Sequence, residues 1–483
     1  MTRLIVGPFN RVEGDLEVRI DCKGGEVVNA EVVTPLYRGF ERILLGKPPM
    51  DALVYAPRIC GICSVSQSVA AAMALADTMK VELPSNGELA INLVHATENV
   101  ADHLTHFYLF FMPDFARATY KNEPWYDETA DRFVAIRGTA AEDMLPARAQ
   151  FMHMMGILAG KWPHTLSIQP GGSTRSVDGG EVVRLMAILA AFRKFLERTL
   201  FGDKLERIAN LSSEAELVAW AAERSVTSSD FRRFLHVSSA LGLNCLGRST
   251  GAFLSYGAYG TQGNSLFRMG TFAAGDTGSM DVEGITEDLS SSWYRSGVTS
   301  EAPAAGTTVP DADKDGAYSW CKAPRLGGSV MEVGALARQL VNGHPLIRDL
   351  VGRHGGSVHA RVVARLLEIA IVVQAMERWA AGLVIGERYI AHAGLPDQAE
   401  GIGLTEAARG SLGHWLSIEK GRIANYQIIA PTTWNFSPRD QSGVPGPLEQ
   451  ALVGAPVREG EEDPVSVQHI VRSFDPCMVC TVH

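Results

Sequence analysis

Two stretches of this sequence each contain a Cys-x-x-Cys pair, Arg58-Ile59-Cys60-Gly61-Ile62-Cys63 and Asp475-Pro476-Cys477-Met478-Val479-Cys480. The first stretch leads directly into helical sequence at residues 64–80, so a rigid element can hold its thiolates. A lone pair of this kind more often indicates a zinc knuckle or a redox dithiol. Together, the two pairs supply four soft ligands, which suit zinc, nickel, copper(I) or an iron–sulfur cluster.

The separation of the two pairs along the chain weighs against a structural zinc site. Such sites usually connect short local loops, whereas these pairs lie near opposite ends of 483 residues. No βαβ pattern surrounds either pair, which argues against a thioredoxin-like dithiol. We therefore predict a buried tetrathiolate site for a transition metal that joins the two chain ends, with structural zinc as the alternative.

Outward from the first pair, the sequence is mostly helical in character. Apolar residues recur at helical spacing in residues 64–80, 85–114, 182–201, 215–234 and 358–385. A stop or kink is expected at Pro113, because proline cannot continue a regular helix. Several long helices with apolar faces predict a helical bundle as the core.

The N-terminal sequence alternates as a β-hairpin does, with LEVRIDC at residues 16–22, EVVNAEVVT at 26–34 and a Gly-rich turn between them. The predicted fold is therefore α+β and predominantly helical, in a single domain. Its expected parts are a β-rich start at 1–50, a helical core with the metal site at 51–240 and 330–483, and a small irregular, partly β subdomain at 242–308, all within one domain over residues 1–483.

Composition excludes several classes of protein. Apolar residues make up 46% and charged residues 20%, as in ordinary folded proteins, and the net charge of −10 argues against a nucleic-acid partner. The apolar runs are far shorter than the ~20 residues of a membrane-spanning helix, so we expect no membrane insertion. The N-terminus lacks the apolar core of a signal peptide, which favours a cytoplasmic location.

Eight blocks of sequence, spread over nearly the whole chain, match one family. They are RVEG at 11–14, RGFE at 38–41, RICGIC at 58–63, DHLTHFY at 102–108, KAPRLGGSVMEVGALAR at 322–338, ARGSLGHW at 408–415, APTTWN at 430–435 and DPCMVCTVH at 475–483. With these blocks in this order, the chain resembles the large, catalytic subunit of the nickel–iron hydrogenases. The resemblance reduces zinc to a minor alternative.

The resemblance implies that all four thiolates bind nickel, with Cys63 and Cys480 also bridging to iron and Cys60 and Cys477 terminal. The iron would carry carbonyl and cyanide ligands, which makes a Ni–Fe(CN)2(CO) centre that binds H2 and cleaves it heterolytically. The ligand chemistry agrees with this, because a coordinated thiol is already deprotonated and is free to accept a proton.

Four further residues match catalytic positions of the family. Glu13 matches a proton-relay carboxylate near Cys477, although composition alone favours an ordinary surface glutamate. Arg409 matches an arginine over the open nickel–iron face, where its permanent charge can polarise H2; a surface salt bridge is the alternative. Asp114 and Asp475 match the acids that brace this arginine.

The resemblance also implies two supporting sites. Thr432 matches the loop that contacts the cyanide ligands, whose nitrogens accept hydrogen bonds. Glu41, His483 and the backbone carbonyl near Ile428 match a second site for a hard cation, Mg2+, which would pin the C-terminus. Without this role, a terminal histidine is expected to fray.

Some residues depart from the common family pattern. Gln67 stands where most members have histidine, Ala408 replaces a proline and Thr432 replaces a serine. Together with the RICGICSVSQS block, Gln67 resembles the H2-sensing and cyanobacterial-uptake branch. Ile62 and Phe110 are larger than the usual Val and Leu, so we expect them to narrow a gas passage that admits H2 more easily than O2; simple core filling is the alternative.

The main hypothesis for function is a regulatory H2 sensor that signals through a small subunit to a sensor histidine kinase. Electrons need an iron–sulfur small subunit, because no cysteine set remains for a relay in this chain. Maturation proteins are further expected partners. One alternative is an energy-conserving uptake hydrogenase. Another is a non-catalytic, complex I-like structural subunit, against which the four cysteines argue.

Overall fold

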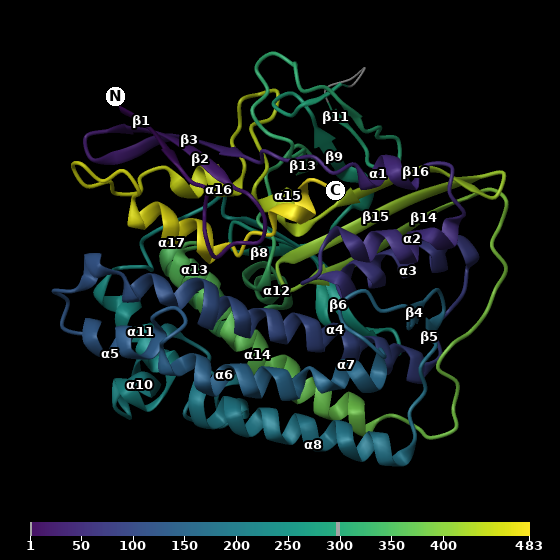
Figure 1. The fold of residues 1–483 in the computed structure, drawn as a ribbon, viewed down its shortest axis with the longest axis horizontal. Helices are drawn as coiled ribbons and strands as arrows, with labels where there is room; N and C mark the ends of the chain where they lie inside the picture. Colours follow the sequence, from purple (N-terminus) through teal and green to yellow (C-terminus); the bar gives the residue numbers. More distant parts are fainter. Residues whose placement is uncertain (1, 296–299) are drawn as a thin grey trace.

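The computed structural model describes residues 2–295 and 300–483. Its core is a group of long helices that run side by side: α4 (Ser85–Thr105), α6 (Thr139–Phe151), α8 (Gly179–Phe195) and α14 (Val358–Ala381) (Figure 1). Helix α14 packs against both α4 and α8, and α6 packs against α8. The predicted helical bundle is confirmed.

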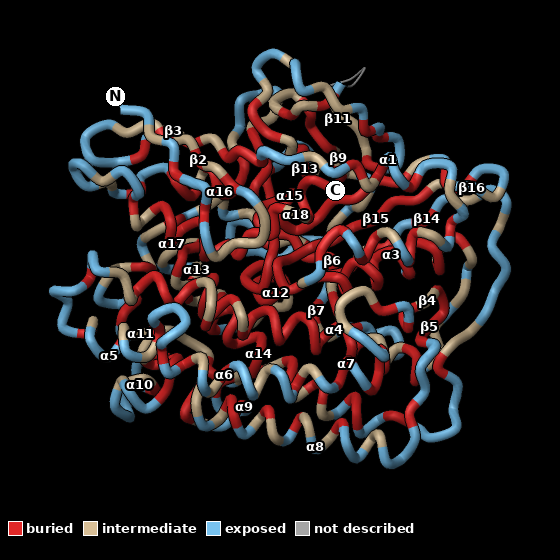
Figure 2. Tube along the Cα trace, viewed as in Figure 1, coloured by how far each residue is buried: buried red, intermediate tan, exposed pale blue. Residues whose placement is uncertain are grey.

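Helix α14 lies at the centre of this bundle. Ser357 caps its start, since the Ser357 side chain accepts the N–H of Ala360, and the helix ends before Gly382. Its apolar residues are distributed around the whole helix, and most of its length is buried, as Figure 2 shows. The buried residues include Arg361, Arg365 and Glu368, so charged groups are enclosed in the core and need partners there.

One predicted helix is in fact two. Residues 215–234 are expected to be one continuous helix, but they form α10 (Glu214–Ala222) and the first part of α11 (Asp230–Ala240). Serine side chains explain the break, since Ser225 and Ser229 accept backbone N–H groups and start a new turn and a new helix.

The predicted helix at residues 85–114 also changes character before its end. The α-helical part, α4, ends at Thr105. It is followed directly by a π-helix at His106–Phe111 and then by a 3-10 helix at Met112–Ala116. Pro113 lies in the last of these, where the missing N–H costs no regular helical hydrogen bond. The change in residues per turn shifts the side chains of this segment to new directions.

The N-terminal hairpin is confirmed and has a third strand. β1 (Thr2–Val6), β2 (Glu17–Lys23) and β3 (Glu26–Val33) form an antiparallel sheet in that order. Val18 and Ile20 of β2 are buried while their neighbours are partly exposed, which is the alternation that the sequence shows.

The segment at 242–308 is more regular than its sequence predicts. β6 (Ala252–Thr261) and β7 (Asn264–Ala273) form a long antiparallel hairpin, which β8 (Asp276–Gly278) extends. Most residues of β6 are buried whichever side they face. A strand covered on both faces has no alternating pattern, which explains the weak periodicity.

A further sheet lies within residues 330–483, which were expected to be helical core. It consists of β14 (Ala399–Ala407), β15 (Gly410–Glu419) and β16 (Arg422–Ile429), all antiparallel. Helix α3 (Ser64–Met79) packs directly on β14 and β15. Gly401 and Gly403 make this possible, because a Cβ atom there would lie 2.2 and 2.0 Å from carbonyl oxygens of α3. The segment expected to be helical core therefore also contains a three-stranded sheet.

The remaining elements are short and complete a mixed α+β fold in which helices predominate, as predicted. The helices are α1 (Phe40–Leu44), α2 (Ala52–Tyr55), α5 (Tyr126–Phe133), α7 (His153–Leu158), α9 (Leu205–Ala209), α12 (Ala335–Asn342), α13 (Pro345–His354), α15 (Pro431–Asn435), α16 (Pro447–Leu452), α17 (Val465–Ser473) and α18 (Met478–Thr481). The strands are β4 (Ile168–Gln169), β5 (Gly172–Ser173), β9 (Ile285–Asp288), β10 (Tyr294–Arg295), β11 (Ser300–Glu301), β12 (Val309–Pro310) and β13 (Ala323–Leu326).

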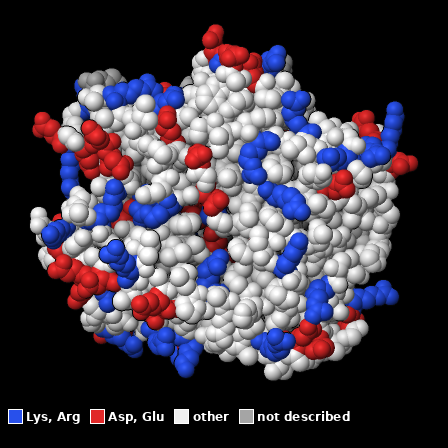
Figure 3. Space-filling view, viewed as in Figure 1, with Lys and Arg blue, Asp and Glu red and all other residues white. Residues whose placement is uncertain are grey.

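The surface carries charges of both signs. On the face drawn in Figure 3, acidic and basic side chains are interspersed rather than gathered by sign. Among the residues that the structure describes, no helix is both long enough and apolar enough to span a bilayer.

Candidate metal centre

The structure brings the two cysteine pairs together in the interior. Cys60 follows a 3-10 helix (Ala56–Ile59), Cys63 is the first residue before α3, and Cys477 and Cys480 lie at the start and in the last turn of α18. All four Sγ atoms lie within 4.8 Å of one another, and all four residues are buried. The Sγ atoms of Cys63 and Cys480 are 3.2 Å apart, and those of Cys60 and Cys477 are 3.4 Å apart.

The thiols influence one another strongly. Hydrogen bonds from Cys477, Cys480 and Cys63 hold the pKa of Cys60 well below its usual value. The pKa values of the other three thiols are raised, that of Cys477 chiefly by burial. Four soft donors at this spacing are the set that a thiophilic transition metal requires, and the residues fit such an ion.

The N-terminal segment places the C-terminal cysteines. Glu13 and Cys477 form a parallel β-bridge, in which the N–H of Met478 donates to the Glu13 carbonyl over 2.7 Å. The Glu13 N–H donates to the carbonyl of Pro476 over 3.3 Å. The chain approaches closely here because Gly14 has φ +85° and lies against the backbone of Val479.

Arg38 ties the two cysteine loops to each other, a role that sequence reasoning missed. Its guanidinium donates to the carbonyls of Ile59 and Arg58, which precede Cys60, and to that of Val479 over 3.3 Å, which precedes Cys480. Its backbone N–H donates to Val482 over 2.9 Å. The RGFE block contains this arginine and was the available signal.

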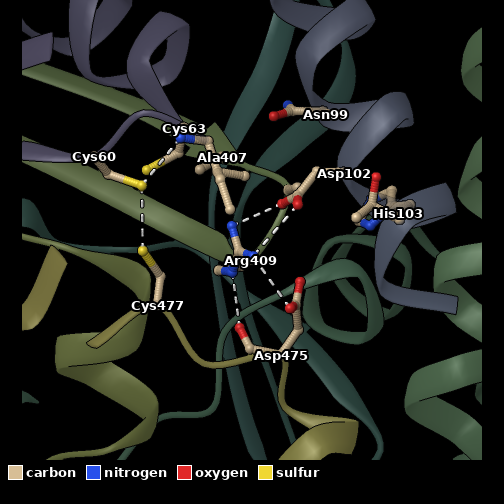
Figure 4. Close-up of polar contacts among 12 residues, drawn as sticks. Cys60, Cys63, Asn99, Asp102, His103, Ala407, Arg409, Asp475 and Cys477 are labelled. Carbon is tan, nitrogen blue, oxygen red and sulfur yellow. Dashed lines mark hydrogen bonds and ion pairs between the residues drawn. The ribbon is translucent and has the colours of Figure 1, made fainter. Parts of the chain in front are cut away.

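Arg409 lies beside the cysteines at the turn between β14 and β15, as Figure 4 shows. It is buried, with 3% of its surface exposed. Its guanidinium donates to the Asp102 carboxylate over 2.8 and 3.3 Å, to the Asp475 carboxylate over 3.2 Å and to the Asp475 carbonyl over 2.9 Å. Burial opposes its charge, but these acids and the nearby Cys477 raise its pKa well above the usual value.

The expected pairing of Asp114 with Arg409 is wrong. Asp114 instead accepts hydrogen bonds from Arg11 and Arg472, with 2.8 Å to Arg472, and it contacts His469. Burial would raise its pKa, but these partners lower it strongly. Asp114 lies twelve residues after Asp102, more than three helical turns further along the chain, so it is too far along to share the contact that Asp102 makes. Asp102, which lies within the regular part of α4 in the DHLTHFY block, takes the predicted place.

Glu13 is half-buried, and its pKa is raised by burial and by the negative charge at Cys60. The structure therefore places a carboxylate of raised proton affinity on the segment that pairs with Cys477. Thr432 lies at the start of α15, and its Oγ1 accepts the N–H of Cys477 over 3.0 Å. Its hydroxyl proton remains able to donate to another acceptor.

The three residues of the expected cation site lie together. His483 Nε2 is 3.3 Å from a Glu41 oxygen, and the backbone N–H of Ile428 donates to the same oxygen over 2.9 Å. The Lys322 ammonium is also 3.1 Å from Glu41 and 3.2 Å from Glu287. Burial would raise the pKa of Glu41, but Lys322 and His483 lower it to about 2. The contact that Ile428 makes is through its N–H rather than the expected carbonyl.

The residues that depart from the family pattern have distinct surroundings. Gln67 is buried on α3, and its Oε1 lies 2.8 Å from Nε2 of His414 on β15. Ile62 is half-buried, and its N–H donates to the Cys60 sulfur over 3.3 Å. Phe110 is half-buried on the π-helix, where its carbonyl accepts from Arg11 over 3.2 Å. The gas passage stays a prediction.

Comparison with known proteins agrees with this site. The family model for nickel-dependent hydrogenases matches residues 38–124 and 141–483. The chain is 30% identical to the periplasmic NiFeSe hydrogenase large subunit of Desulfomicrobium baculatum, covering 100% of this chain and 95% of that protein. It is 27% identical to the uptake hydrogenase large subunit of Azotobacter chroococcum, with 100% and 95% covered.

A solved structure has the same fold. The reduced Ni-Fe-Se hydrogenase of D. vulgaris Hildenborough superposes with a TM-score of 0.85 at 30% identity, covering 100% of both chains. A family match over most of the chain, a common fold and four converging cysteines support a nickel–iron centre rather than structural zinc. The chain belongs to the nickel-dependent hydrogenase family, as a large subunit.

Proposed function

We propose that this chain is the H2-cleaving subunit of a hydrogenase that oxidises H2 in continuous turnover. The observation that supports this most is the buried set of four cysteines with the Arg409 guanidinium beside it. A nickel–iron group held by Cys60, Cys63, Cys477 and Cys480 would supply the Lewis-acid centre at which H2 is polarised and split. The protein residues around it manage charge and protons.

The proton from H2 needs an acceptor and a way out. We assign the first acceptance to a cysteine thiolate and the next to Glu13, whose backbone is paired with that of Cys477. Because its pKa is raised, this carboxylate takes up a proton more readily than an ordinary glutamate and can release it again. Glu13→Gln should therefore retain the metals but lose H2/D+ exchange. Normal exchange in the fully loaded variant would remove Glu13 from this role.

Arg409 contributes a fixed positive charge. Two carboxylates, Asp102 and Asp475, hold the guanidinium at the edge of the cysteine cluster, so its charge needs no reorganisation during the reaction. The group is permanently protonated, which makes it an electrostatic residue and not a proton carrier.

Two further parts of the proposal concern groups around the centre. Iron would carry carbonyl and cyanide, and the Thr432 hydroxyl, whose oxygen accepts the Cys477 N–H, would donate a hydrogen bond to a cyanide nitrogen. Mg2+ would be held by Glu41 and His483 close to Ile428. Oxygen and imidazole donors suit that cation, and the arrangement would anchor the C-terminus next to Cys480.

The relatives favour turnover over sensing. The proteins described above carry the names of periplasmic and uptake hydrogenases, and none of those names denotes a sensor. The sensor hypothesis, with its histidine-kinase partner, rests on Gln67, Ile62 and Phe110. The rate of H2 oxidation with a soluble electron acceptor distinguishes the uptake hypothesis from the sensor hypothesis. A rate on the order of 10 s⁻¹ or more, typical of enzymes, supports the uptake role, and a rate about a hundredfold lower supports the sensor.

The proposal requires an iron–sulfur small subunit as the electron acceptor. Among the described residues, Cys22, Cys245 and Cys321 are the cysteines outside the centre, and they are not gathered into a cluster of potential ligands. The cytoplasmic location stays a prediction. Cell fractionation decides it, and one relative is named as periplasmic.

Metal analysis and infrared spectroscopy test the proposal. We expect about one nickel and one iron per chain, together with infrared bands of carbonyl and cyanide. Cys63→Ser and Cys480→Ser should abolish both, because each removes a proposed bridging ligand. A zinc-containing protein without those bands would contradict the proposed function. Cys321→Ser is the matched control, because Cys321 is equally buried but lies outside the cluster.

A further inference from the structure

The turn that carries Arg409 is buried. Ala407 pairs with Gly410 across the β14–β15 hairpin, so Ala408 and Arg409 form a two-residue turn. Ala408 and Arg409 are each 3% exposed. Turns normally lie at the surface, because buried backbone carbonyls need hydrogen-bond donors. This turn therefore depends on donors from elsewhere in the chain.

Arg338, in α12, supplies those donors. Its Nη1 donates to the Ala407 carbonyl over 2.9 Å, and its Nη2 donates to the Ala408 carbonyl over 3.0 Å. These are the two carbonyls immediately before Arg409. A proline at position 408 would fix its own φ angle, but alanine does not. The conformation of the turn therefore depends on the hydrogen bonds that the Arg338 side chain donates to it.

Two buried carboxylates fix Arg338 in turn. Glu368 accepts its Nε over 3.0 Å and its Nη2 over 2.7 Å, while Glu406 accepts its Nη1 over 2.7 Å. With the two carbonyls, these bonds occupy all five N–H donors of the guanidinium. Arg338 and both acids are almost completely buried. His103, the neighbour of Asp102 on α4, donates its Nε2–H to Glu368 over 3.0 Å.

The backbone around the turn is packed so closely that the turn has little room to adopt another conformation. A Cβ atom at Gly410 would lie 2.6 Å from Val333 and 2.7 Å from the N atom of Gly334, immediately before α12. The start of α12, with Arg338 in it, is thus pressed against the Arg409 turn. A small movement of α12 or of Arg338 would displace Arg409 relative to the cysteines.

We propose that Arg338 is a positioning residue that holds Arg409 beside the cysteine cluster, through its hydrogen bonds to the carbonyls of Ala407 and Ala408. This inference rests on the proposed function, in which Arg409 acts beside the metals. Arg338 touches neither the cysteines nor the Arg409 side chain in the bonds described above, so its effect on H2 cleavage runs through the position of Arg409.

A double-mutant cycle with Arg338→Lys and Arg409→Lys tests this in the complete, metal-loaded enzyme. Lysine keeps the charge but cannot donate to two carboxylates and two carbonyls in a planar fork. Arg338→Lys should lower H2/D+ exchange by about tenfold or more, since misplacement of a catalytic group by ~1 Å can cost ~100-fold. Nickel content should be unchanged.

The coupling between the two changes is the decisive readout. When Arg409→Lys is already present, adding Arg338→Lys should lower H2/D+ exchange by less than about threefold, because the guanidinium that Arg338 positions is no longer there. Amide hydrogen exchange of residues 405–411 should also become faster in Arg338→Lys. The matched control is Arg132→Lys, since Arg132 also bridges two carboxylates, Asp230 and Asp143, far from the Arg409 turn in the fold. It should change neither readout.

Several results would overturn the inference. They are wild-type exchange in Arg338→Lys, losses that multiply in the double variant, or unchanged hydrogen exchange at 405–411. Full activity in Arg409→Lys would instead overturn the role of Arg409 in the proposed function, and the hydrogen-exchange readout would still test the grip of Arg338. If Arg338→Lys does not fold, the isosteric Glu368→Gln takes its place in the cycle, with a smaller expected loss and the same coupling criterion.

Discussion

Asp102 is the carboxylate that makes the closest contact with Arg409, at 2.8 Å, and both side chains are almost completely buried. Burial raises the pKa of Asp102 above its usual value and Arg409 only partly opposes this rise, so the charge of Asp102 depends on keeping this partner. A buried ion pair of this kind costs a great deal to break on one side, because the remaining charge is left without compensation.

Asp102→Asn should lower H2 cleavage by about tenfold or more while nickel content stays at the wild-type level. The amide preserves the size of the side chain but removes the charge that fixes the guanidinium. H2/D+ exchange and metal analysis of the same preparation check this. Asp143→Asn, at the more exposed partner of Arg132, is the control and should be silent. Equal exchange rates in Asp102→Asn and the control would contradict the assignment.

His414 provides a test by pH. Burial lowers its pKa to about 3, and its nitrogens lie 2.8 Å from Tyr426 and 2.8 Å from Gln67. The unfolded chain binds this proton near pH ~6.5 and the folded chain only near its lowered pKa. Stability from the neutral histidine is therefore complete above pH ~6.5 and is lost as the pH falls below it.

Between about pH 7.5 and 5.5, His414 alone should account for a loss of about 1 kcal/mol in the free energy of unfolding. His414→Gln should remove that share of the loss, as measured by denaturant unfolding at both pH values. His153→Gln, at an exposed histidine, should leave the pH dependence as in the wild type. An unchanged difference in His414→Gln would show that His414 does not stay neutral in the fold.

Among the elements, the two cysteine loops depend on connections that cross the whole sequence. Arg38 stands just before α1 and donates to carbonyls in both loops. A charged donor can contribute roughly 1.5–3 kcal/mol per hydrogen bond, and less at Arg38, because this side chain is exposed to solvent. Arg38 should therefore govern how tightly the centre keeps its metal.

Arg38→Lys should release nickel to a chelator about tenfold faster than the wild type, because a single ammonium cannot reach carbonyls in both loops. Nickel remaining on the protein over time measures this directly. Arg42→Lys is the matched control, since Arg42 is an exposed arginine four residues away in α1. Equal release from both variants would leave Arg38 without this role.

The elements also explain what the sequence could and could not predict. Residues 64–80 and 358–385 showed helical periodicity and are helices α3 and α14, since their apolar residues meet other helices and sheets. β15 escaped prediction because it is buried on both faces and contains glycines, so it has no alternation. Asp114 was assigned to Arg409 from the family resemblance, and no pattern in the sequence shows that Asp102 makes this contact instead.

For the whole molecule, the cysteine cluster closes the chain on itself. Residues near both ends meet there, and the C-terminal segment is held by the Glu13 bridge, Arg38 and the contact of His483 with Glu41. A metal shared by both pairs would add its binding free energy to these contacts and stabilise the closed arrangement.

Removal of the metals should loosen the C-terminal segment more than any other part. Amide hydrogen exchange at residues 474–483 should become faster in chelator-treated protein, while residues 358–381 of α14 should remain protected as an internal control. Equal protection of 474–483 with and without metal would mean that the hydrogen bonds alone hold the segment.

The central claim is that four cysteines hold a nickel–iron centre at which this chain cleaves H2. Formation of HD from H2 in D2O, by purified protein together with its small subunit and with its metal content known, tests it. We expect HD formation in proportion to the nickel content and its loss in Cys480→Ser. Protein fully loaded with nickel and iron that forms no HD would contradict the claim.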